Sequence, residues 1–309
     1  MREETLRIGL IGLDSSHSVD FTKVLNDSSH PYYVPGGQVT AAYKGGSPDM
    51  ALSIGRVEGY TRQLIDSYRI RLVDDLAALA DQVDAMMITS MDGRIHLEQF
   101  AAIAASGKPV FVNKPFAVST EDAKAMLELA ERYSVPIMSS SSLRYMEGLQ
   151  AARSSAEQRA IFGADVFGPM KLEPQMPGLF WYGVHLVEML YAVMGPGCVQ
   201  VSTVTNDGSD MIIGEWADGR VGMLRGNRMG NNQYGCIIHR ADGSQYIVDS
   251  HERKPAHVIM IERMMEMFRT GSVPIPASEL LEVVRFMEAA NESRDSGEKI
   301  NLMNGDLNR

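Results

Sequence analysis

The sequence contains few of the features that characterise disulfide-rich, membrane-spanning or nucleic-acid-binding proteins. Its two cysteines, Cys198 and Cys236, are too few and too isolated for a disulfide framework or a thiolate metal site. No apolar run approaches membrane-spanning length, and no apolar signal segment follows Met1. Lysine and arginine form no long run, and a net charge of −10 argues against a nucleic-acid surface. We therefore expect a cytoplasmic protein that binds neither membrane nor nucleic acid.

The residues that are present predict an α/β domain in the first half of the chain. The 309 residues, 45% of them apolar, leave room for two domains. Segments that read as buried strands alternate with segments of helical periodicity, which is typical of a doubly wound parallel sheet. The strands are expected at residues 6–12, 39–43, 83–89, 110–112 and 135–138. We assign residues 1–118 to this Rossmann-type domain, completed by a helix and a strand within 119–145.

The pattern changes after about residue 146. One helix is expected over 179–194, and two more near 258–268 and 280–287. Between them, alternating segments flank the turns Asp218-Gly219 and Asp242-Gly243, which is typical of antiparallel hairpins. Residues 146–309 are therefore predicted to form an α+β domain on a mostly antiparallel, open sheet.

Lys114 is the most informative candidate in the first half. Val110-Phe111-Val112 predicts a short buried strand that Pro115 must end, because proline cannot donate to a sheet. Lys114 then lies at the carboxyl end of a strand, where open parallel sheets bind their ligands. Apolar surroundings would favour its neutral form and suit it to proton transfer. The alternative is a surface lysine beside a proline.

The first strand leads into a turn that resembles an altered dinucleotide-binding fingerprint. Gly12 fits the first glycine, but Asp14 and His17 occupy the second and third glycine positions. A carboxylate there would repel a pyrophosphate unless the loop is re-routed, whereas Ser15 and Ser16 could cap the helix and contact phosphate.

The second predicted strand ends in Lys44, where NAD-binding domains usually carry an acid. A cation followed by Gly45-Gly46-Ser47 suits a 2′-phosphate, so NADP fits better than NAD. A solvated lysine before a turn is the alternative.

In order along the chain, these motifs resemble the Gfo/Idh/MocA oxidoreductase family, which includes glucose–fructose oxidoreductase and inositol dehydrogenase. One match is His96 followed by the segment 104–115, which ends in Asn113-Lys114-Pro115 in place of Glu-Lys-Pro. The other is Gly183-Val184-His185-x-x-Glu188, similar to the family's Gly-x-His-x-x-Asp helix. The resemblance implies NAD(P)-dependent oxidation of a sugar or cyclitol hydroxyl, and a homodimer or homotetramer formed through the C-terminal sheet.

The resemblance also implies roles for individual residues. The catalytic candidates are Lys114, His185 and Glu188, with His185 or Lys114 accepting the hydroxyl proton and Glu188 orienting the imidazole. The substrate-binding candidates are Ser142, Arg144, Trp181 and His185. No helix-face pairing of histidines suggests a metal ligand set. The cofactor-binding candidates are Gly12, Asp14, Ser15, Ser16, His17, Lys44, Thr89, His96, Asn113 and Lys114.

Trp181 stands where the family places a catalytic aspartate, four residues before the histidine. It could stack on a pyranose or belong to the core at the helix entrance, and His185 could be a buried histidine paired with Glu188. The missing aspartate leaves two alternatives to a dehydrogenase. One is a lyase or glycosidase that retains its cofactor through transient oxidation, and the other is a non-catalytic ligand-binding relative.

Overall fold

The computed structural model describes residues 5–154 and 161–302, and the chain divides into two compact units. The first comprises residues 1–117, 121–140 and 260–276, and the second comprises 118–120, 141–259 and 277–309. The segment 260–276, expected in the second domain, thus belongs to the first unit. It packs there because Met265 lies against Gly37 and the guanidinium of Arg269 donates to the carbonyl of Pro35 at 2.8 Å.

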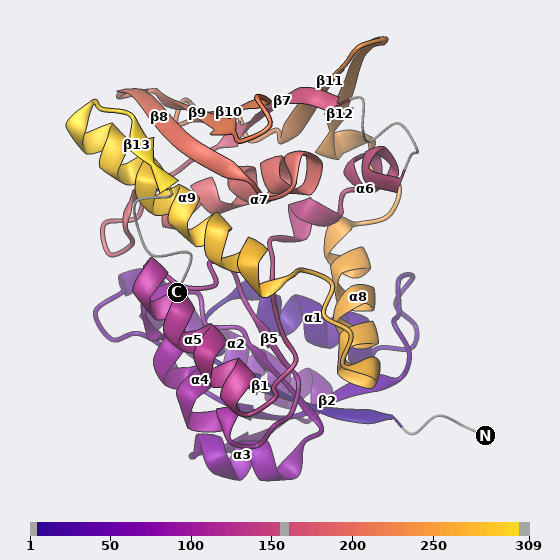
Figure 1. The fold of residues 1–309 in the computed structure, drawn as a ribbon. Helices are drawn as coiled ribbons and strands as arrows, with labels where there is room; N and C mark the ends of the chain where they lie inside the picture. Colours follow the sequence, from indigo (N-terminus) through magenta and orange to yellow (C-terminus); the bar gives the residue numbers. More distant parts are fainter. Residues whose placement is uncertain (1–4, 155–160, 303–309) are drawn as a thin grey trace. The chain divides into compact units, whose positions relative to one another are not determined.

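The first unit contains a six-stranded sheet in the order β3-β2-β1-β4-β5-β6 (Figure 1), in which every neighbouring pair is parallel. This order places the topological switch point between β1 and β4, where ligands bind in such folds. The predicted doubly wound sheet is confirmed. Its strands are β1 (Leu6–Ile11), β2 (Gly37–Tyr43), β3 (Arg71–Val73), β4 (Ala85–Ile88), β5 (Val110–Val112) and β6 (Ile137–Ser139).

Helices follow the strands of this sheet, as right-handed crossovers require. In the first unit α1 packs against α2, and α3 packs against α4. Ser15 caps α1 by accepting the N–H of His17, and Asp75 caps α3 in the same way through Ala78. These helices are α1 (Ser16–Asn26), α2 (Ala51–Tyr68), α3 (Leu76–Gln82), α4 (His96–Ala104), α5 (Thr120–Arg132) and, from residue 260 onward, α8 (Ala256–Thr270).

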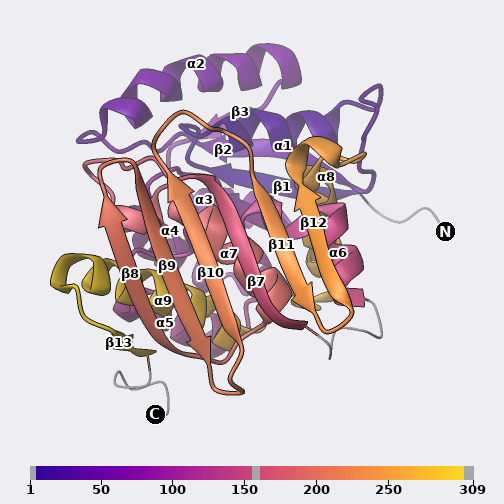
Figure 2. The same cartoon turned by 90° about the horizontal axis from the view of Figure 1, so that it is seen from above.

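The second unit is built on a seven-stranded sheet in the order β12-β11-β7-β10-β9-β8-β13. Only β7 and β10 pair in parallel, so the predicted mostly antiparallel sheet is confirmed. Figure 2 shows the strands from β8 to β12 side by side in this order, with α7 and α9 behind them. The strands are β7 (Ile161–Pro169), β8 (Cys198–Asn206), β9 (Ser209–Trp216), β10 (Val221–Asn227), β11 (Gly235–Arg240), β12 (Gly243–Val248) and β13 (Ile300–Asn301).

The helices of the second unit bury the inner face of its sheet. They are α6 (Glu147–Ser154), α7 (Gly183–Met194) and α9 (Ala277–Ser296), and the short turn η2 (Ser142–Tyr145) precedes α6. The single helix expected over 179–194 is wrong at its start. A separate turn, η4 (Gly178–Phe180), comes first, and α7 begins only at Gly183, with Trp181 and Tyr182 between the two elements.

Candidate active site

The turn between β1 and α1 requires glycine at position 12. Gly12 has a φ of +84°, and a Cβ atom there would lie 1.9 Å from the Oγ of Ser90. The neighbouring turn after β2 also comes close, since a Cβ on Gly45 would lie 3.0 Å from the Cα of Gly12. Two backbone segments therefore meet at the carboxyl end of β1 with no room for side chains.

Asp14 does not point its carboxylate out of this turn. The side chain is fully buried, and it accepts hydrogen bonds from the Ser53 hydroxyl at 2.6 Å and from the Met91 N–H at 3.0 Å. The turn between β1 and α1 thus directs this carboxylate into the protein, where it connects the turn to the start of α2 and to the segment after β4. An acid at a fingerprint glycine position is compatible with a bound anion here, because both of its oxygens are engaged inside the protein.

The N-terminus of α1 faces outward beside this turn. Ser15 is the buried cap, whereas Ser16 is exposed as the first helical residue. The Nδ1 of His17 lies 2.8 Å from the Oδ1 of Asn113, and that same oxygen accepts the N–H of Lys114 at 2.9 Å. Asn113 therefore connects the start of α1 to the end of β5, with the helix N-terminus available to an anion.

Two predicted cofactor ligands turn out to be part of the scaffold. Thr89 is buried, and its hydroxyl donates to the Gly12 carbonyl at 2.5 Å. His96 is also fully buried, with Nδ1 2.9 Å from the Pro115 carbonyl and Nε2 3.0 Å from the Ser90 carbonyl. Burial lowers the pKa of His96. Both side chains hold the ends of β1, β4 and β5 together.

Lys114 follows β5 and is half-buried rather than exposed. Desolvation by burial lowers its pKa to about 8. The neutral amine is therefore far more populated near physiological pH than in an ordinary lysine, although the ammonium form still predominates, so the side chain can accept a proton as well as donate one.

Lys44, expected to receive a 2′-phosphate, forms an ion pair with Glu58 of α2. Both side chains are largely exposed, so the pair contributes little stability and the ammonium can be drawn to another anion at low cost. Glu58 also places a carboxylate at the end of β2, where ribose hydroxyls bind in such folds. The structure thus brings a cation and an acid to the same place.

In the second unit, His185 lies in the first turn of α7 with its ring held on several sides. Its Nδ1 is 2.7 Å from the Oγ of Ser141, which also accepts the N–H of Leu143 at 3.2 Å. The rings of Tyr182 and Tyr234 meet the imidazole edge-on, with centroids 5.8 Å away in each case. The structure offers Ser141 for the orienting role that the spacing assigned to Glu188.

Glu188 instead belongs to a buried charge cluster. Its Oε2 lies 2.5 Å from the Nε of Arg144, and the Nη1 of Arg144 is 2.6 Å from the Oε1 of Glu279. All three side chains are at most 5% exposed. Burial opposes the charge on Arg144, but the two carboxylates outweigh it and raise the pKa of the guanidinium. Arg144 therefore joins η2, α7 and α9.

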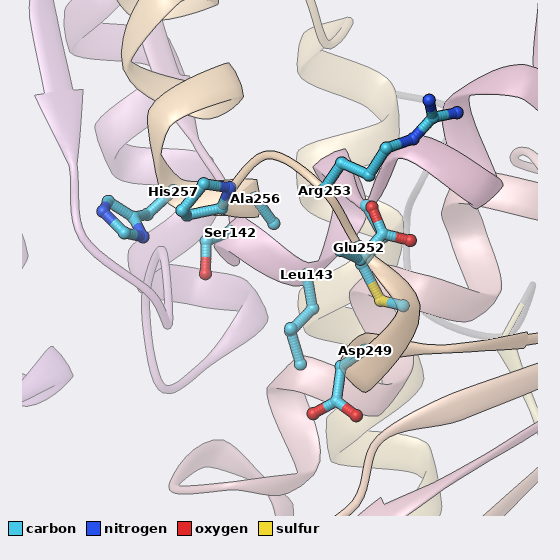
Figure 3. Close-up of a pocket in the computed structure, with 9 residues that line it drawn as sticks. Ser142, Leu143, Asp249, Glu252, Arg253, Ala256 and His257 are labelled. Carbon is cyan, nitrogen blue, oxygen red and sulfur yellow. The ribbon is translucent and has the colours of Figure 1, made fainter. Parts of the chain in front are cut away.

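Trp181 and Ser142 are the remaining predicted substrate ligands. Trp181 is only 8% exposed at the entrance of α7, which favours the core alternative. Ser142 lines a pocket of about 260 Å³, where Figure 3 shows it beside the imidazole of His257. Asp249 and Glu252 line the same pocket.

Sequence reasoning missed several residues that shape these sites. Ser53, Glu58 and Glu279 lie on helices far along the chain from their partners, so no local spacing could connect them. Tyr234 lies in the loop after β10, and its contact with His185 had no signal in the sequence.

No cluster of three or more histidine, cysteine, aspartate or glutamate side chains that could hold a metal occurs among residues 5–154 and 161–302. Within the same ranges, no helix is both long enough and apolar enough to span a membrane.

Residues 6–141 match the model of an oxidoreductase family with an NAD-binding Rossmann fold, Gfo/Idh/MocA. A comparison with curated proteins finds no match.

Three solved structures share the fold over almost the whole chain. GenD2 from gentamicin A biosynthesis, in complex with NAD, is 17% identical with a TM-score of 0.79 and covers 96% of both chains. Scyllo-inositol dehydrogenase from Lactobacillus casei, with bound NAD(H) and scyllo-inositol, is 13% identical with a TM-score of 0.76 and covers 97% of this chain and 100% of its own. An oxidoreductase from Agrobacterium radiobacter, in complex with NAD+, L-tartaric acid and magnesium, is 18% identical with a TM-score of 0.73, covering 96% and 98%. At these identities the likeness concerns the fold alone.

Proposed function

We propose that the chain is a divergent member of the Gfo/Idh/MocA oxidoreductase family, whose model residues 6–141 match, and that it is an NAD(P)-dependent oxidoreductase acting on a hydroxyl of a sugar, sugar derivative or cyclitol. The observation that carries the proposal is Lys114, a half-buried lysine with its pKa lowered to about 8 at the end of β5. The substrate class is suggested by the structural similarity to scyllo-inositol dehydrogenase and to GenD2 from gentamicin A biosynthesis.

The residues around the switch point fit a dinucleotide. The N-terminus of α1 can receive the pyrophosphate, because Asp14 is turned inward and Ser16 is exposed at the helix start. His17, Asn113 and the turn at Gly12 complete this side of the candidate site. Thr89 and His96 support it by fixing the strand ends.

When bound, the nicotinamide supplies the hydride acceptor for a C–H bond. The protein must then remove the hydroxyl proton, and the two candidates for this step are Lys114 and His185. Ser141 supports the second candidate. If its Oγ accepts a hydrogen bond from Nδ1–H of His185, the basic nitrogen of the imidazole is Nε2.

The proposed cofactor remains NADP or NAD, and the Lys44–Glu58 pair is the feature that decides between them. A 2′-phosphate would attract Lys44 away from Glu58, whereas ribose hydroxyls would donate to Glu58. We expect a modest preference for NADPH, since Lys44 can turn toward the phosphate at low cost.

The test is a calorimetric titration of the protein with NADH and with NADPH. Both should bind, NADPH a few-fold more tightly, and Lys44→Met should remove the NADPH preference while leaving NADH affinity unchanged. Lys23→Met, an exposed lysine of α1, is the matched control. The proposal fails if neither cofactor binds at millimolar concentration, and the role of Lys44 fails if NADH binds more tightly.

A second candidate function is supported by Trp181. The buried indole stands where the family resemblance expects a catalytic aspartate, so the fold could serve a lyase that retains its cofactor or a ligand-binding relative. Nucleotide found in the purified protein would argue against the binder. Product formed without a net change in absorbance at 340 nm would identify the lyase.

A further inference from the structure

Three pockets among the described residues differ in the charge of their walls. The pocket in Figure 3 is lined by Asp249 and Glu252 together with Arg253 and His257, and a pocket of about 280 Å³ in the first unit is lined by Asp49, Asp92 and Arg94. The third pocket, of about 370 Å³ at the ends of β7 and β10, has no carboxylate in its lining. Its polar walls are two cations and three asparagines: Lys171, Arg228, Asn227, Asn231 and Asn232. An acid-free basic pocket is unexpected in a chain with a net charge of −10.

Lys171 is the cation that a ligand can reach. Its side chain is exposed, and its ammonium lies 5.7 Å from the centre of the Tyr182 ring. It forms no ion pair with any residue in the ranges 5–154 and 161–302. Its charge is therefore not offset by a carboxylate of the described chain.

Arg228 adds positive charge from the pocket wall. Its Nη2 lies 2.9 Å from the buried carboxylate of Asp210, and the Nε of Arg294 lies 3.5 Å from the other oxygen of that carboxylate. Two guanidinium groups share one acid, so this cluster keeps one positive charge. The Nη1 of Arg228 is buried and has no hydrogen-bond partner among the described residues.

The asparagines give the pocket a fixed shape. The Nδ2 of Asn227 donates to the carbonyls of Gly168 and Asn231, each at 3.0 Å. The Oδ1 of Asn231 accepts the N–H of Gln233 at 3.0 Å. These bonds hold the loop after β10 against β7, so the pocket is formed before a ligand arrives.

Two successive contacts through Tyr182 connect Lys171 to the candidate catalytic histidine. Lys171 lies over Tyr182, and the Tyr182 ring contacts His185 with centroids 5.8 Å apart. A volume of about 370 Å³ is within the range of small-molecule sites. A sugar-like substrate with its reacting hydroxyl at His185 could place a further group near Lys171.

We propose that this pocket binds an oxyanion, a carboxylate or a phosphate, carried by the sugar-like substrate, with Lys171 as its ionic partner and the side-chain amides of Asn231 and Asn232 as donors. The inference rests on the proposed function for the sugar-like class, and it narrows that class to acidic sugars or sugar phosphates. Ser142 and the pocket of Figure 3 play no part in it.

The experiment is calorimetric titration of the cofactor-free protein with D-glucuronate, D-glucose 6-phosphate and D-glucose. At least one of the two anions should bind about tenfold or more tightly than glucose, the scale of a hydrogen bond to a charged group. Lys171→Met should remove that advantage and Lys171→Arg should retain most of it, while Lys23→Met should change nothing. Whichever anion binds more tightly identifies a carboxylate or a phosphate as the preferred group.

Equal affinity for glucose and both anions would overturn the inference, and so would failure of both anions to bind at millimolar concentration. An anion preference that survives in Lys171→Met would also overturn it. These outcomes are separate from failure of the proposed function, because NADH binding is measured on its own. If the protein binds glucuronate through Lys171 but does not bind NADH, the inference about the anion-binding pocket stands and the proposed dehydrogenase function fails.

Discussion

His96 and His185 lie in the two units of the same chain and show how differently a buried and a half-buried histidine are used. His96 is enclosed, with each ring nitrogen facing a backbone carbonyl, and burial lowers its pKa. His185 is only half-buried, with Nδ1 against Ser141 and two tyrosine rings at its edges. Enclosure makes His96 a scaffold residue, and partial exposure makes His185 a candidate for chemistry.

The same contrast separates the charged candidates. Arg144 is enclosed between two carboxylates, whereas Lys114 is half-buried with its pKa lowered by desolvation. A polar residue within a family-like motif can therefore have either a structural or a catalytic role. Its burial and its hydrogen-bond or ionic partners show which role is favoured.

The largest effect is expected from breaking the enclosed charge cluster. Arg144→Met leaves Glu188 and Glu279 buried without their cation, which should lower the free energy of unfolding by about 3–5 kcal/mol. Arg7→Met breaks the exposed pair with Asp84 and should cost about 1 kcal/mol or less. Urea unfolding of both variants measures the difference. Equal losses would mean that the cluster is not a structural support.

A smaller effect, on rate alone, is expected at the half-buried histidine. His185→Ala should lower kcat about a hundredfold or more, the scale of general acid–base catalysis. Ser141→Ala should cost about tenfold, and Ser141→Thr should recover most of that loss because it restores a hydroxyl. In the double variant, removing Ser141 should add little to the loss from His185→Ala. Independent, additive losses measured by steady-state kinetics would show that Ser141 does not act through His185.

The sequence predicted those parts of the fold that have strong local patterns. The strands from β1 to β6 were found except β3, a three-residue exposed edge strand. The 18-residue helix α2 had no prediction, because only Ser53, Val57, Thr61 and Leu64 are buried and two of these are polar. Gly55 and Gly59 weaken its helical signal further.

At the candidate site, the sequence predicted where residues lie in the fold better than it predicted which side chains they contact. Lys114 was placed at a strand end from three apolar residues and a proline, which are local features. The inward turn of Asp14 depends on Ser53, 39 residues away, and the pairing of Arg144 with Glu279 spans 135 residues. Such contacts are set by packing between helices and have no periodicity to reveal them.

The most direct measurement is the rate of cofactor reduction at 340 nm, with acidic and neutral sugars and cyclitols, as a function of pH. If Lys114 accepts the hydroxyl proton, the amine must be neutral, so the rate should rise as pH passes through about 8 and level off above it. Lys114→Ala should abolish reduction while the circular dichroism spectrum remains close to wild type. Reduction by Lys114→Ala at the wild-type rate would contradict the role given to this lysine, and so would a wild-type profile that is flat through pH 8.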